Sequence, residues 1–344
     1  MLTSELDYDL PPELIAQEPS ARRDQSRLLV LRHQSGELEH CVFSDLLRFL
    51  HPGDALVLNQ SRVIPARLLG TISESGKAAE ILLVRRLEPG RWIAMVKPGR
   101  ALKVGVKVEL GQGLTAEMAG ILPDGMRVVE FYGADSVDEA LLGIGQTPLP
   151  PYIERKKGEL EQDRERYQTV YARHDGSIAA PTAGLHFTPE LLDAVHKDGI
   201  KVVYVTCHIG PGTFRPVTAR VLEEHRMDEE HYTLSAQAAR AINNARLKGG
   251  RVIAVGTSAT RTLESCATED GTLVAHSGRT ELFITPGYQF KVVDALLTNF
   301  HLPRSTTLSL AAAFAGRERL LAAYREAIQR KYRFYSFGDA MLIV

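Results

Sequence analysis

Cysteine is scarce in the 344-residue sequence, and neither sign of charge is in excess. The three cysteines, Cys41, Cys207 and Cys266, lie far apart and form no CxxC pair, which argues against a disulfide framework and a cysteine-rich zinc site. The formal net charge is −1, whereas domains that bind nucleic acid often have a pI above about 9. These two shortages indicate a reducing compartment and a protein that is not basic as a whole.

Long apolar runs are absent as well. The first residues include Glu5 and Asp7, and they contain no apolar core of the length found in signal peptides. The longest uncharged stretch near the end of the chain, Ser305–Gly316, is too short to cross a bilayer. We therefore expect a cytoplasmic protein with no membrane partner.

The common metal and cofactor motifs are also missing. There is no GxxxxGK[ST] phosphate loop, no HExxH zinc motif, no GxSxG nucleophile elbow, and no GxGxxG between a strand and a helix. His225 and His231 flank Glu229 and Glu230, but without the spacing of metal ligands on one helix face. The sequence thus predicts no metal site.

Residues 66–149 form a segment of short apolar runs separated by turn residues such as those at Glu88–Gly90 and Pro123–Gly125. This spacing is typical of a small antiparallel barrel or sandwich. The runs are Ala66–Leu69, Ala79–Arg85, Trp92–Val96, Val104–Leu110, Leu114–Met118 and Arg127–Phe131.

The flanking segments alternate between strand and helix patterns, which favours an α/β domain with a mostly parallel sheet. Thr188 and Ser235 are expected to cap helices, and Ser305–Ala315 reads as a buried helix. We therefore predict an inserted β-barrel domain at 66–149 and a discontinuous α/β domain made of 1–65 and 150–344. The expected strands of the α/β domain are Arg27–Leu31, Ala55–Leu58, Lys201–Thr206, Arg251–Val255 and Glu281–Ile284.

Small and polar residues gather where several of these strands end. In open α/β sheets, ligands bind at the carboxyl ends of the strands, so these segments are candidates for one site. Their glycines would either let the backbone approach a ligand or only turn the chain. The segments are Ala179–Pro189, His208–Pro216, Val255–Thr257, Asn299–His301 and Gly338–Asp339.

Two histidines stand out in these segments. His186 precedes a predicted helix start, whose partial positive charge favours neutral imidazole, the form that acts as a base near pH 7. His208 follows a predicted strand. The plainer alternative for His186 is a hydrogen bond to a loop carbonyl, and Arg261 and Glu264 would equally form an ordinary ion pair one helical turn apart.

Basic residues gather in two places, around Arg22 and Arg23 and along Arg317–Arg333, where six basic and two acidic residues leave a net charge of +4. Solvated helix and loop surface is one interpretation, and contact with an anionic partner such as RNA is the other.

Many segments of the chain, in order, resemble the S-adenosylmethionine:tRNA ribosyltransferase-isomerases of queuosine biosynthesis, and the similarity covers essentially the whole length. They are Asp7–Gln17, Arg27–Val30, Val57–Asn59, Arg62–Arg67, Pro150–Ile153, Arg166–Ala172, Ala180–Thr188, His208–Val217, Thr298–Pro303 and Gly338–Ile343.

The resemblance implies an α/β domain with an inserted β-barrel. It also implies a reaction in which the ribosyl part of S-adenosylmethionine passes to 7-aminomethyl-7-deazaguanine at the tRNA wobble position. Epoxyqueuosine forms, adenine and methionine are released, and S-adenosylmethionine is a substrate rather than a cofactor. A non-catalytic RNA-binding module on the same fold, or a transferase with another nucleoside donor, is the alternative. We expect a monomer.

In two segments of the candidate site, the sequence differs from the residues that are common in the family. Met227-Asp-Glu-Glu230 stands where Met-His-Ser-Glu is common, so any role of that histidine does not carry over. Ser258, Ala259 and Thr260 differ from the usual residues before Arg261, and Arg304 replaces a frequent lysine.

The resemblance and the residue chemistry together give a list of candidate site residues. The reaction needs a base, for which His186, His208 and Glu230 are the candidates. Arg215 or Arg261 would bind the methionine carboxylate, and Phe187 or Phe214 would face the sulfonium. The other expected substrate-binding residues are Thr182, Gly184, Gly210, Gly212, Thr213, Thr257, Asn299 and His301. Expected RNA contacts are phosphate contacts by Arg22, Arg23, Arg325 and Lys331 and base stacking by Tyr152 or Tyr167.

Overall fold

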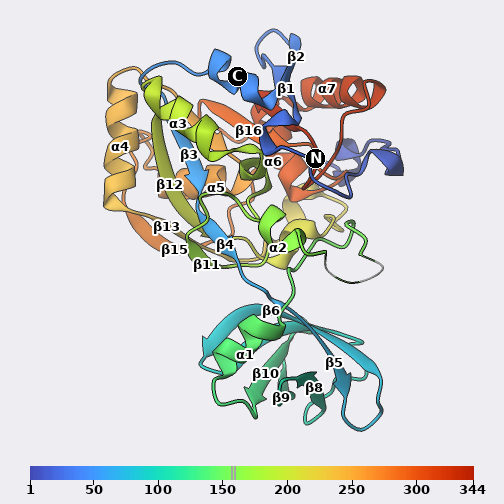
Figure 1. The fold of residues 1–344 in the computed structure, drawn as a ribbon. Coiled ribbons are helices and arrows are strands. Elements are labelled where there is room, and N and C mark those ends of the chain that lie inside the picture. The colour runs from blue at the N-terminus through green and yellow to red at the C-terminus, as the bar shows by residue number, and fades with distance from the viewer. Residues whose placement is uncertain (156–157, 159) are drawn as a thin grey trace.

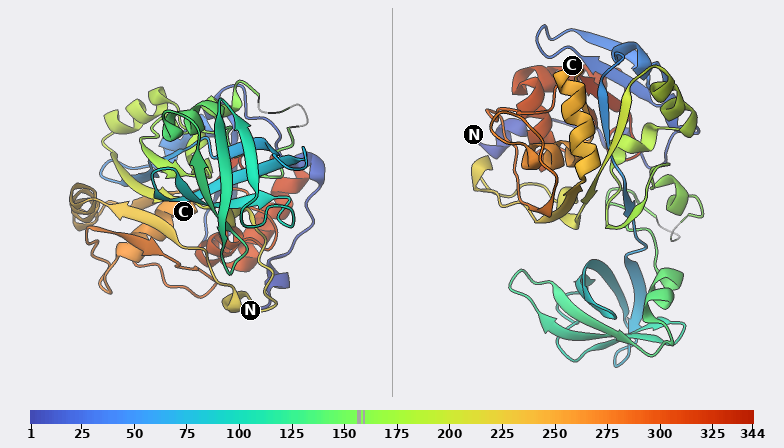
Figure 2. Two further views of the ribbon diagram at one scale, coloured as in Figure 1. Left: turned by 90° about the horizontal axis from the view of Figure 1, so that it is seen from below. Right: turned by 90° about the vertical axis from the view of Figure 1, so that its left-hand side faces the viewer.

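The computed structural model describes residues 1–155, 158 and 160–344, and these form a larger α/β part and a smaller β-barrel. The barrel lies beyond one end of the α/β part and is joined to it by a narrow connection, as Figure 1 and the right-hand view of Figure 2 show. The two segments of that connection lie side by side. The expected fold class, an α/β domain with an inserted antiparallel barrel, is confirmed.

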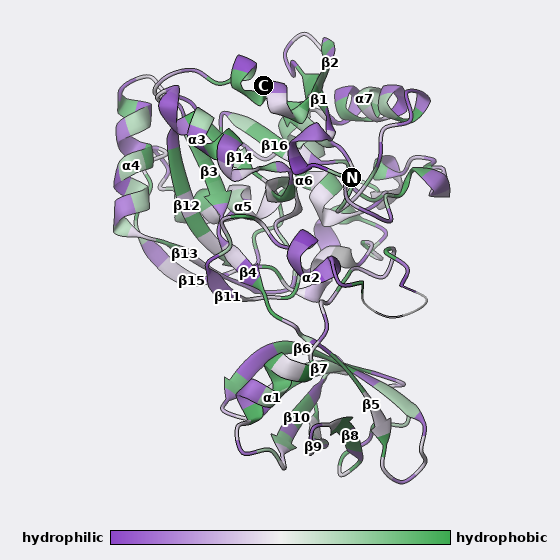
Figure 3. Ribbon diagram, in the orientation of Figure 1, coloured by the Kyte–Doolittle hydropathy of each residue, from purple (hydrophilic) through white to green (hydrophobic). Residues whose placement is uncertain are grey.

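The α/β part is built on a nine-stranded sheet with the order β15-β13-β12-β3-β14-β16-β17-β1-β2. Its centre is parallel: β12 (Lys201–His208), β3 (Ala55–Asn59), β14 (Val252–Val255) and β16 (Ala295–Asn299) run in one direction. β3, β14 and β16 are buried at every residue, and strands of this region are mostly green in Figure 3. A parallel sheet covered on both faces needs such apolar strands.

Antiparallel strands complete both edges of the sheet. β13 (Glu230–Leu234) pairs with β12 and with β15 (His276–Thr280) at one edge. At the other, β17 (Ala340–Ile343) pairs antiparallel with β16 and parallel with β1 (Arg27–Leu31), which pairs with β2 (Leu38–Val42). Both ends of the chain are thus tied into one sheet.

Helices cover both faces of the sheet. α3 (Pro189–Lys197) packs on one face, and α4 (Ala236–Leu247) and α5 (Thr257–Cys266) pack on the other. α6 (Thr306–Ala315) and α7 (Arg317–Gln329) build a third apolar cluster around Tyr324 and Phe334. The Thr188 and Ser235 side chains accept hydrogen bonds from the backbone N–H groups of Leu191 and Ala238, so both predicted caps are confirmed.

Each of the six predicted runs of the inserted segment contains a strand, and these strands close into an antiparallel barrel with the order β10-β7-β6-β5-β8-β9. Short α1 (Val137–Ile144) follows the barrel and packs on it. The strands are β5 (Arg67–Ile72), β6 (Ala78–Glu88), β7 (Arg91–Lys97), β8 (Lys107–Gly111), β9 (Leu114–Ile121) and β10 (Arg127–Tyr132).

The chain enters and leaves the barrel at one point. Arg67 and Gln146 exchange two backbone hydrogen bonds, with N–O distances of 3.1 and 2.8 Å. Just beyond this pair, β4 (Ser61–Val63) runs parallel to β11 (His174–Ser177), and the short α2 (Asp163–Arg166) lies in the returning segment. The two connecting segments therefore form a small paired structure of their own.

Gly145 packs against this junction, and we predict that it tolerates no side chain. A Cβ atom there would lie 2.1 Å from the Pro65 carbonyl oxygen and 2.7 Å from that of Leu141, and both are backbone atoms. We expect Gly145→Ala to lower the free energy of unfolding by about 1–3 kcal/mol, as overpacking does. Urea titration measures the loss.

Gly143 provides the matched control. A Cβ atom at this position in α1 would lie 3.3 Å from Oε1 of Gln112, the far end of a flexible side chain. Gly143→Ala should therefore be neutral, or stabilising by up to about 1 kcal/mol because alanine favours helix. Equal losses in both variants would contradict the steric account of Gly145.

One expected strand is not formed, and one strand in the centre of the sheet was not expected. Glu281–Ile284 is not a strand, because β15 ends at Thr280. β16 was not expected, since Ala295-Leu-Leu-Thr-Asn299 shows no alternation and Thr298 is its only β-branched residue.

None of the helices in the described residues is long and apolar enough to cross a membrane.

Candidate active site

Four of the five polar segments singled out in the sequence meet at one cavity, which we call the first cavity. It lies at the carboxyl edge of β12, β14 and β16, where α/β sheets bind ligands. The empty space between its walls, measured out to the mouth, is about 890 Å³. Of the expected catalytic and substrate-binding residues, those that line it are Thr182, Thr213, Glu230, Thr257, Arg261, Asn299 and His301.

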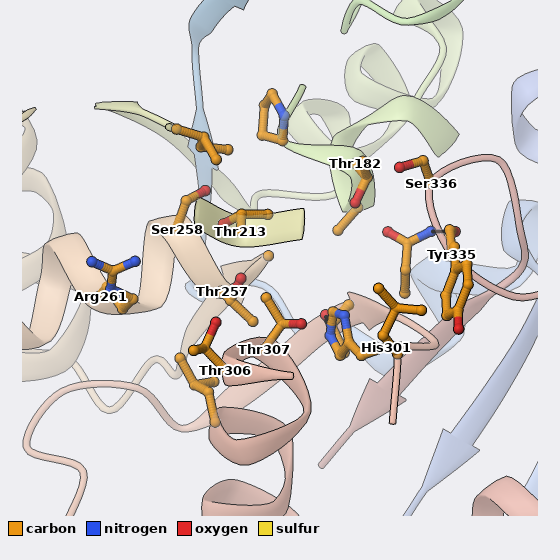
Figure 4. A pocket seen from close by; sticks show the side chains of 18 of the residues that line it. Thr182, Thr213, Thr257, Ser258, Arg261, His301, Thr306, Thr307, Tyr335 and Ser336 are labelled. Atoms are coloured by element: carbon orange, nitrogen blue, oxygen red, sulfur yellow. Dashed lines mark hydrogen bonds between the residues drawn. The ribbon is translucent and has the colours of Figure 1, made fainter. Parts of the chain in front are cut away.

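Hydroxyl groups are the commonest polar groups in the walls of the first cavity, which are otherwise largely apolar. Figure 4 shows Arg261 at one end, Tyr335 and Ser336 at the other, and a series of hydroxyl side chains between them. Such a lining suits a ligand with many hydrogen-bonding groups. The hydroxyl residues labelled along the walls are Thr182, Thr213, Thr257, Ser258, Thr306 and Thr307.

The N-terminus of α5 faces the first cavity without a side-chain cap. Its N-cap residue is Gly256, with φ of 86°, and Gly256, Thr257 and Ser258 all line the wall. Backbone N–H groups and the positive end of a helix dipole favour an anion at such a position. A carboxylate of a ligand would be stabilised there.

A buried ion pair forms the Arg261 end of the cavity. Nη1 of Arg261 donates to Oε2 of Glu230 over 2.8 Å, and both side chains are at least 93 % buried. The Gly210 N–H also donates to Glu230, over 3.4 Å. The expected pair with Glu264 does not form, because Glu264 accepts from backbone N–H groups of Lys291, Val292 and Val293.

His301 lines the first cavity from the segment after β16. Its Nε2 lies 2.7 Å from Oγ1 of Thr298. Burial lowers the pKa of His301 to about 3, so the ring is neutral at physiological pH. A neutral ring at this position accepts or donates one hydrogen bond and carries no charge toward a ligand.

His186 lies behind the wall of the first cavity rather than in it. Its ring is 5 % exposed and stacks on Phe43 at a centroid distance of 4.9 Å. Burial, followed by the charges of Arg23 and Arg333, lowers the pKa of His186 to about 3. The imidazole is thus kept neutral chiefly by burial and not by a helix terminus, and Asn299 stands between it and the cavity.

His208 lies at the end of β12 and lines a second cavity, between the α/β domain and the barrel. Its Nδ1 is 2.8 Å from Oγ of Ser61. Burial, and then the charges of His231 and His174, lower the pKa of His208 below 6.5. Gly176 passes so close that a Cβ atom there would be 2.8 Å from the ring, which fixes where the imidazole lies.

The second cavity is larger, with about 1600 Å³ of empty space out to its mouth. Arg85, Arg86 and Trp92 of the barrel face Arg279 of β15 across it. Ile209 lines both cavities, so the segment from His208 to Thr213 is a thin wall between them. Gly210 faces the second cavity, and Asp228, at the position where the family often has histidine, also lines it.

Several other candidates lie away from both cavities. Phe187 is completely buried and packs edge-on against Phe43, and Gly184 has no space for a side chain because of Tyr171. Gly212 is covered by the Asp228 carboxylate, and Arg215 is exposed and donates to Met95 Sδ in the barrel over 3.3 Å. The side chain of Phe214 lies outside the described part of the structure.

The expected RNA contacts differ in exposure. Arg22, Arg325 and Lys331 are exposed, while Arg23 donates to the carbonyl oxygens of Leu185 and Glu165 and so ties loops together. Tyr152 lines the first cavity and its hydroxyl lies 2.6 Å from Oγ of Ser336. Tyr167 is fully buried against Phe337, so neither face of the Tyr167 ring is open to a base in this structure.

Sequence reasoning missed Thr306, Thr307, Tyr335 and Ser336, which line the first cavity. A sequence signal for Thr306 and Thr307 was present, since Ser305 caps α6 shortly after the Asn299–His301 segment and so places both threonines in the first turn of that helix. Among the described residues, no group of three or more His, Cys, Asp or Glu side chains is placed to hold a metal ion.

Comparisons with known proteins agree with one another. A family model described as "Queuosine biosynthesis protein" matches residues 3–343. S-adenosylmethionine:tRNA ribosyltransferase-isomerases of Caldanaerobacter subterraneus subsp. tengcongensis and Moorella thermoacetica are 51% and 53% identical to the chain, with 100% of both chains covered in each case. A crystal structure of S-adenosylmethionine tRNA ribosyltransferase from Thermotoga maritima shares 41% identity at a TM-score of 0.57, covering 99% of this chain and 100% of that one. The chain therefore belongs to the queuosine biosynthesis family of S-adenosylmethionine:tRNA ribosyltransferase-isomerases.

Proposed function

We propose that the protein transfers and isomerises the ribosyl moiety of S-adenosylmethionine onto 7-aminomethyl-7-deazaguanine at the wobble position of tRNA. The products are epoxyqueuosine-tRNA, adenine and methionine. The observation that carries this proposal is the pair of cavities separated only by the His208–Thr213 wall. Two substrates bound on opposite sides of a thin wall meet at its edge, which is what a transfer between them requires.

S-adenosylmethionine occupies the first cavity in this proposal. Its methionine carboxylate lies at the end where the uncapped N-terminus of α5 and the Arg261 guanidinium meet. Glu230 is the ion-pair partner that holds Arg261 there, rather than the base. Thr213, Thr257 and the other hydroxyl groups bind the ribose and the polar atoms of the adenine.

The wobble nucleotide enters the second cavity from the barrel side. Arg85, Arg86 and Arg279 can contact phosphates there, although Asp124, Asp175, Asp228 and Glu229 line the same cavity, and Trp92 supplies a ring for stacking. His208 faces this cavity with a neutral ring. It takes one proton from the aminomethyl ammonium group of the acceptor, whose nitrogen then has a free lone pair with which to attack the ribosyl group.

The exposed basic residues away from the cavities would extend the RNA contact. Arg325 on α7 and Lys331 just after it are exposed, as is Arg22, and such side chains bind phosphates without reading sequence. The three cysteines are free, as expected for a protein that acts beside its tRNA substrate in the cytoplasm.

One incubation tests the proposed function against its alternatives. The purified protein is mixed with S-adenosylmethionine and a tRNA that carries 7-aminomethyl-7-deazaguanine. We expect adenine release by chromatography and an equal molar gain of ribosyl mass on the tRNA. Adenine without a gain on the tRNA would indicate another acceptor, and no adenine would indicate a binding module or another nucleoside donor. Unmodified tRNA is the control, and it should gain no mass.

A further inference from the structure

The side-chain amide of Asn299 has one possible orientation. Asn299 ends β16, lines the first cavity and is 2 % exposed. One side of its amide lies 3.1 Å from the backbone carbonyl oxygen of Tyr335. A carbonyl oxygen accepts hydrogen bonds and never donates them, so the atom beside it is the amide nitrogen Nδ2. The oxygen Oδ1 is thereby fixed on the other side.

A chain of hydrogen bonds holds the amide in this orientation. Nδ2 of Asn299 also lies 3.2 Å from Nε2 of His186, which must accept because Nδ2 can only donate. The proton of the neutral imidazole is then on Nδ1, which donates to Oγ of Ser26 over 2.7 Å. Ser26 in turn donates to the carbonyl oxygen of Arg23 over 3.4 Å. Every link of this chain has a fixed direction.

The amide oxygen at the end of this chain is unsatisfied. No group in the described part of the chain donates a hydrogen bond to Oδ1 of Asn299, although the atom is buried. Buried polar atoms of folded proteins nearly always have partners, because an unpaired one costs stability. A residue that lines a cavity and keeps a fixed acceptor without a partner is suited to a ligand that brings the donor.

We propose that Oδ1 of Asn299 accepts a hydrogen bond from an N–H group of S-adenosylmethionine, and that His186 is a positioning residue that holds this acceptor in place. The inference rests on the proposed function. S-adenosylmethionine has two such donors, the 6-amino group of adenine and the methionine ammonium group. Asn299 contacts the backbone of Tyr335. Tyr335 and Arg261 lie at opposite ends of the cavity (Figure 4), so we expect the adenine amino group to be the donor.

Two substrate analogues identify the donor. One has hydrogen in place of the 6-amino group, and the other has hydrogen in place of the α-amino group. Calorimetry measures the binding of each, and of S-adenosylmethionine, to the wild-type protein and to Asn299→Ala. We expect the first analogue to bind the wild type about tenfold more weakly than S-adenosylmethionine, and to bind Asn299→Ala as well as S-adenosylmethionine does.

The second analogue, which lacks the α-amino group, tests the methionine ammonium group as the donor. If the ammonium group is the donor, its removal weakens binding to the wild type by about 10- to 100-fold, and this loss disappears in Asn299→Ala. Either pattern supports the acceptor role and names the donor. The proposal is overturned when neither analogue shows a loss that depends on Asn299. Turnover of the wild-type protein is measured in parallel, so that failure of the proposed function is seen separately.

Two variants of His186 separate positioning from base catalysis, and they keep the test open if Asn299→Ala does not fold. Glutamine places an acceptor and a donor at the two ends of its amide and can restore both hydrogen bonds of the imidazole. We expect His186→Gln to keep kcat within about tenfold and to keep the analogue discrimination. His186→Leu should lose the discrimination and raise KM. A base at this position predicts instead a fall in kcat of about 10²- to 10⁴-fold in His186→Gln, and that result would overturn the positioning role.

Discussion

Replacing His208 with alanine is expected to lower the turnover number by about 10²- to 10⁴-fold, the usual contribution of a general base, and to change S-adenosylmethionine affinity by less than about threefold. Turnover and affinity should respond differently because the His208 ring faces the cavity that receives the acceptor. S-adenosylmethionine lies on the other side of the His208–Thr213 wall. Single-turnover kinetics and calorimetry measure the two quantities. His196→Ala, an exposed histidine at the end of α3, is the control and should retain full turnover. A large loss of affinity in His208→Ala would place His208 in the S-adenosylmethionine site instead.

The pH dependence of the wild-type protein follows from the same residue. Burial lowers the pKa of His208 below 6.5, so the ring is neutral at pH 7 and above and gains its proton only at lower pH. The neutral ring is the form that accepts a proton from the substrate. Turnover should therefore be flat from pH 8 down to about 6.5 and fall at more acidic pH, with an apparent pKa below 6.5.

Removing the Glu230 carboxylate is expected to cost about 3–5 kcal/mol of stability, because Glu230→Ala leaves the Arg261 guanidinium buried and without its charge partner. The neighbouring residue is a matched control. Glu229 pairs with Arg279 over 3.0 Å, but about half of each side chain is exposed, so Glu229→Ala should cost no more than about 1 kcal/mol. Urea titration measures both variants, and similar losses would contradict the argument from burial.

A double variant separates the structural and functional consequences of the Glu230–Arg261 pair. Replacing Arg261 with Met and Glu230 with Leu removes both charges and should recover most of the stability that Glu230→Ala loses. Turnover should remain low, since Arg261 no longer supplies a cation at the end of the first cavity. Recovery of turnover together with stability would mean that the pair has only a structural role.

Local sequence patterns predicted most of the architecture. Alternating apolar residues and turn glycines predicted each barrel strand, and Thr188 and Ser235 predicted two helix starts through their capping hydroxyls. β16 was missed because the run Ala295–Asn299 has no alternation and, unlike β3 and β14, no valine or isoleucine, so its sequence suits a helix equally well. Short buried strands depend on tertiary partners that no local window contains.

The sequence pointed to the right segments but could not rank their residues. His186 and Asn299 are 113 positions apart, and their contact, which makes the histidine a support for the amide, comes from the fold alone. Tyr167 and Phe187 look like residues that bind a base or a cation, yet both are fully buried. Burial is the property that separates these cases, and it belongs to the packed structure rather than to the residue type.

The paired junction at Arg67 and Gln146 also bears on how the α/β sheet assembles. Joining β4 to β11 across more than a hundred residues of unfolded chain would carry the entropy cost of closing a long loop. A folded barrel presents its two ends one hydrogen-bond pair apart, so for the rest of the chain the insertion acts as a short turn. Early folding of the barrel would then hasten sheet formation, since it shortens the effective separation between the two halves of the α/β domain.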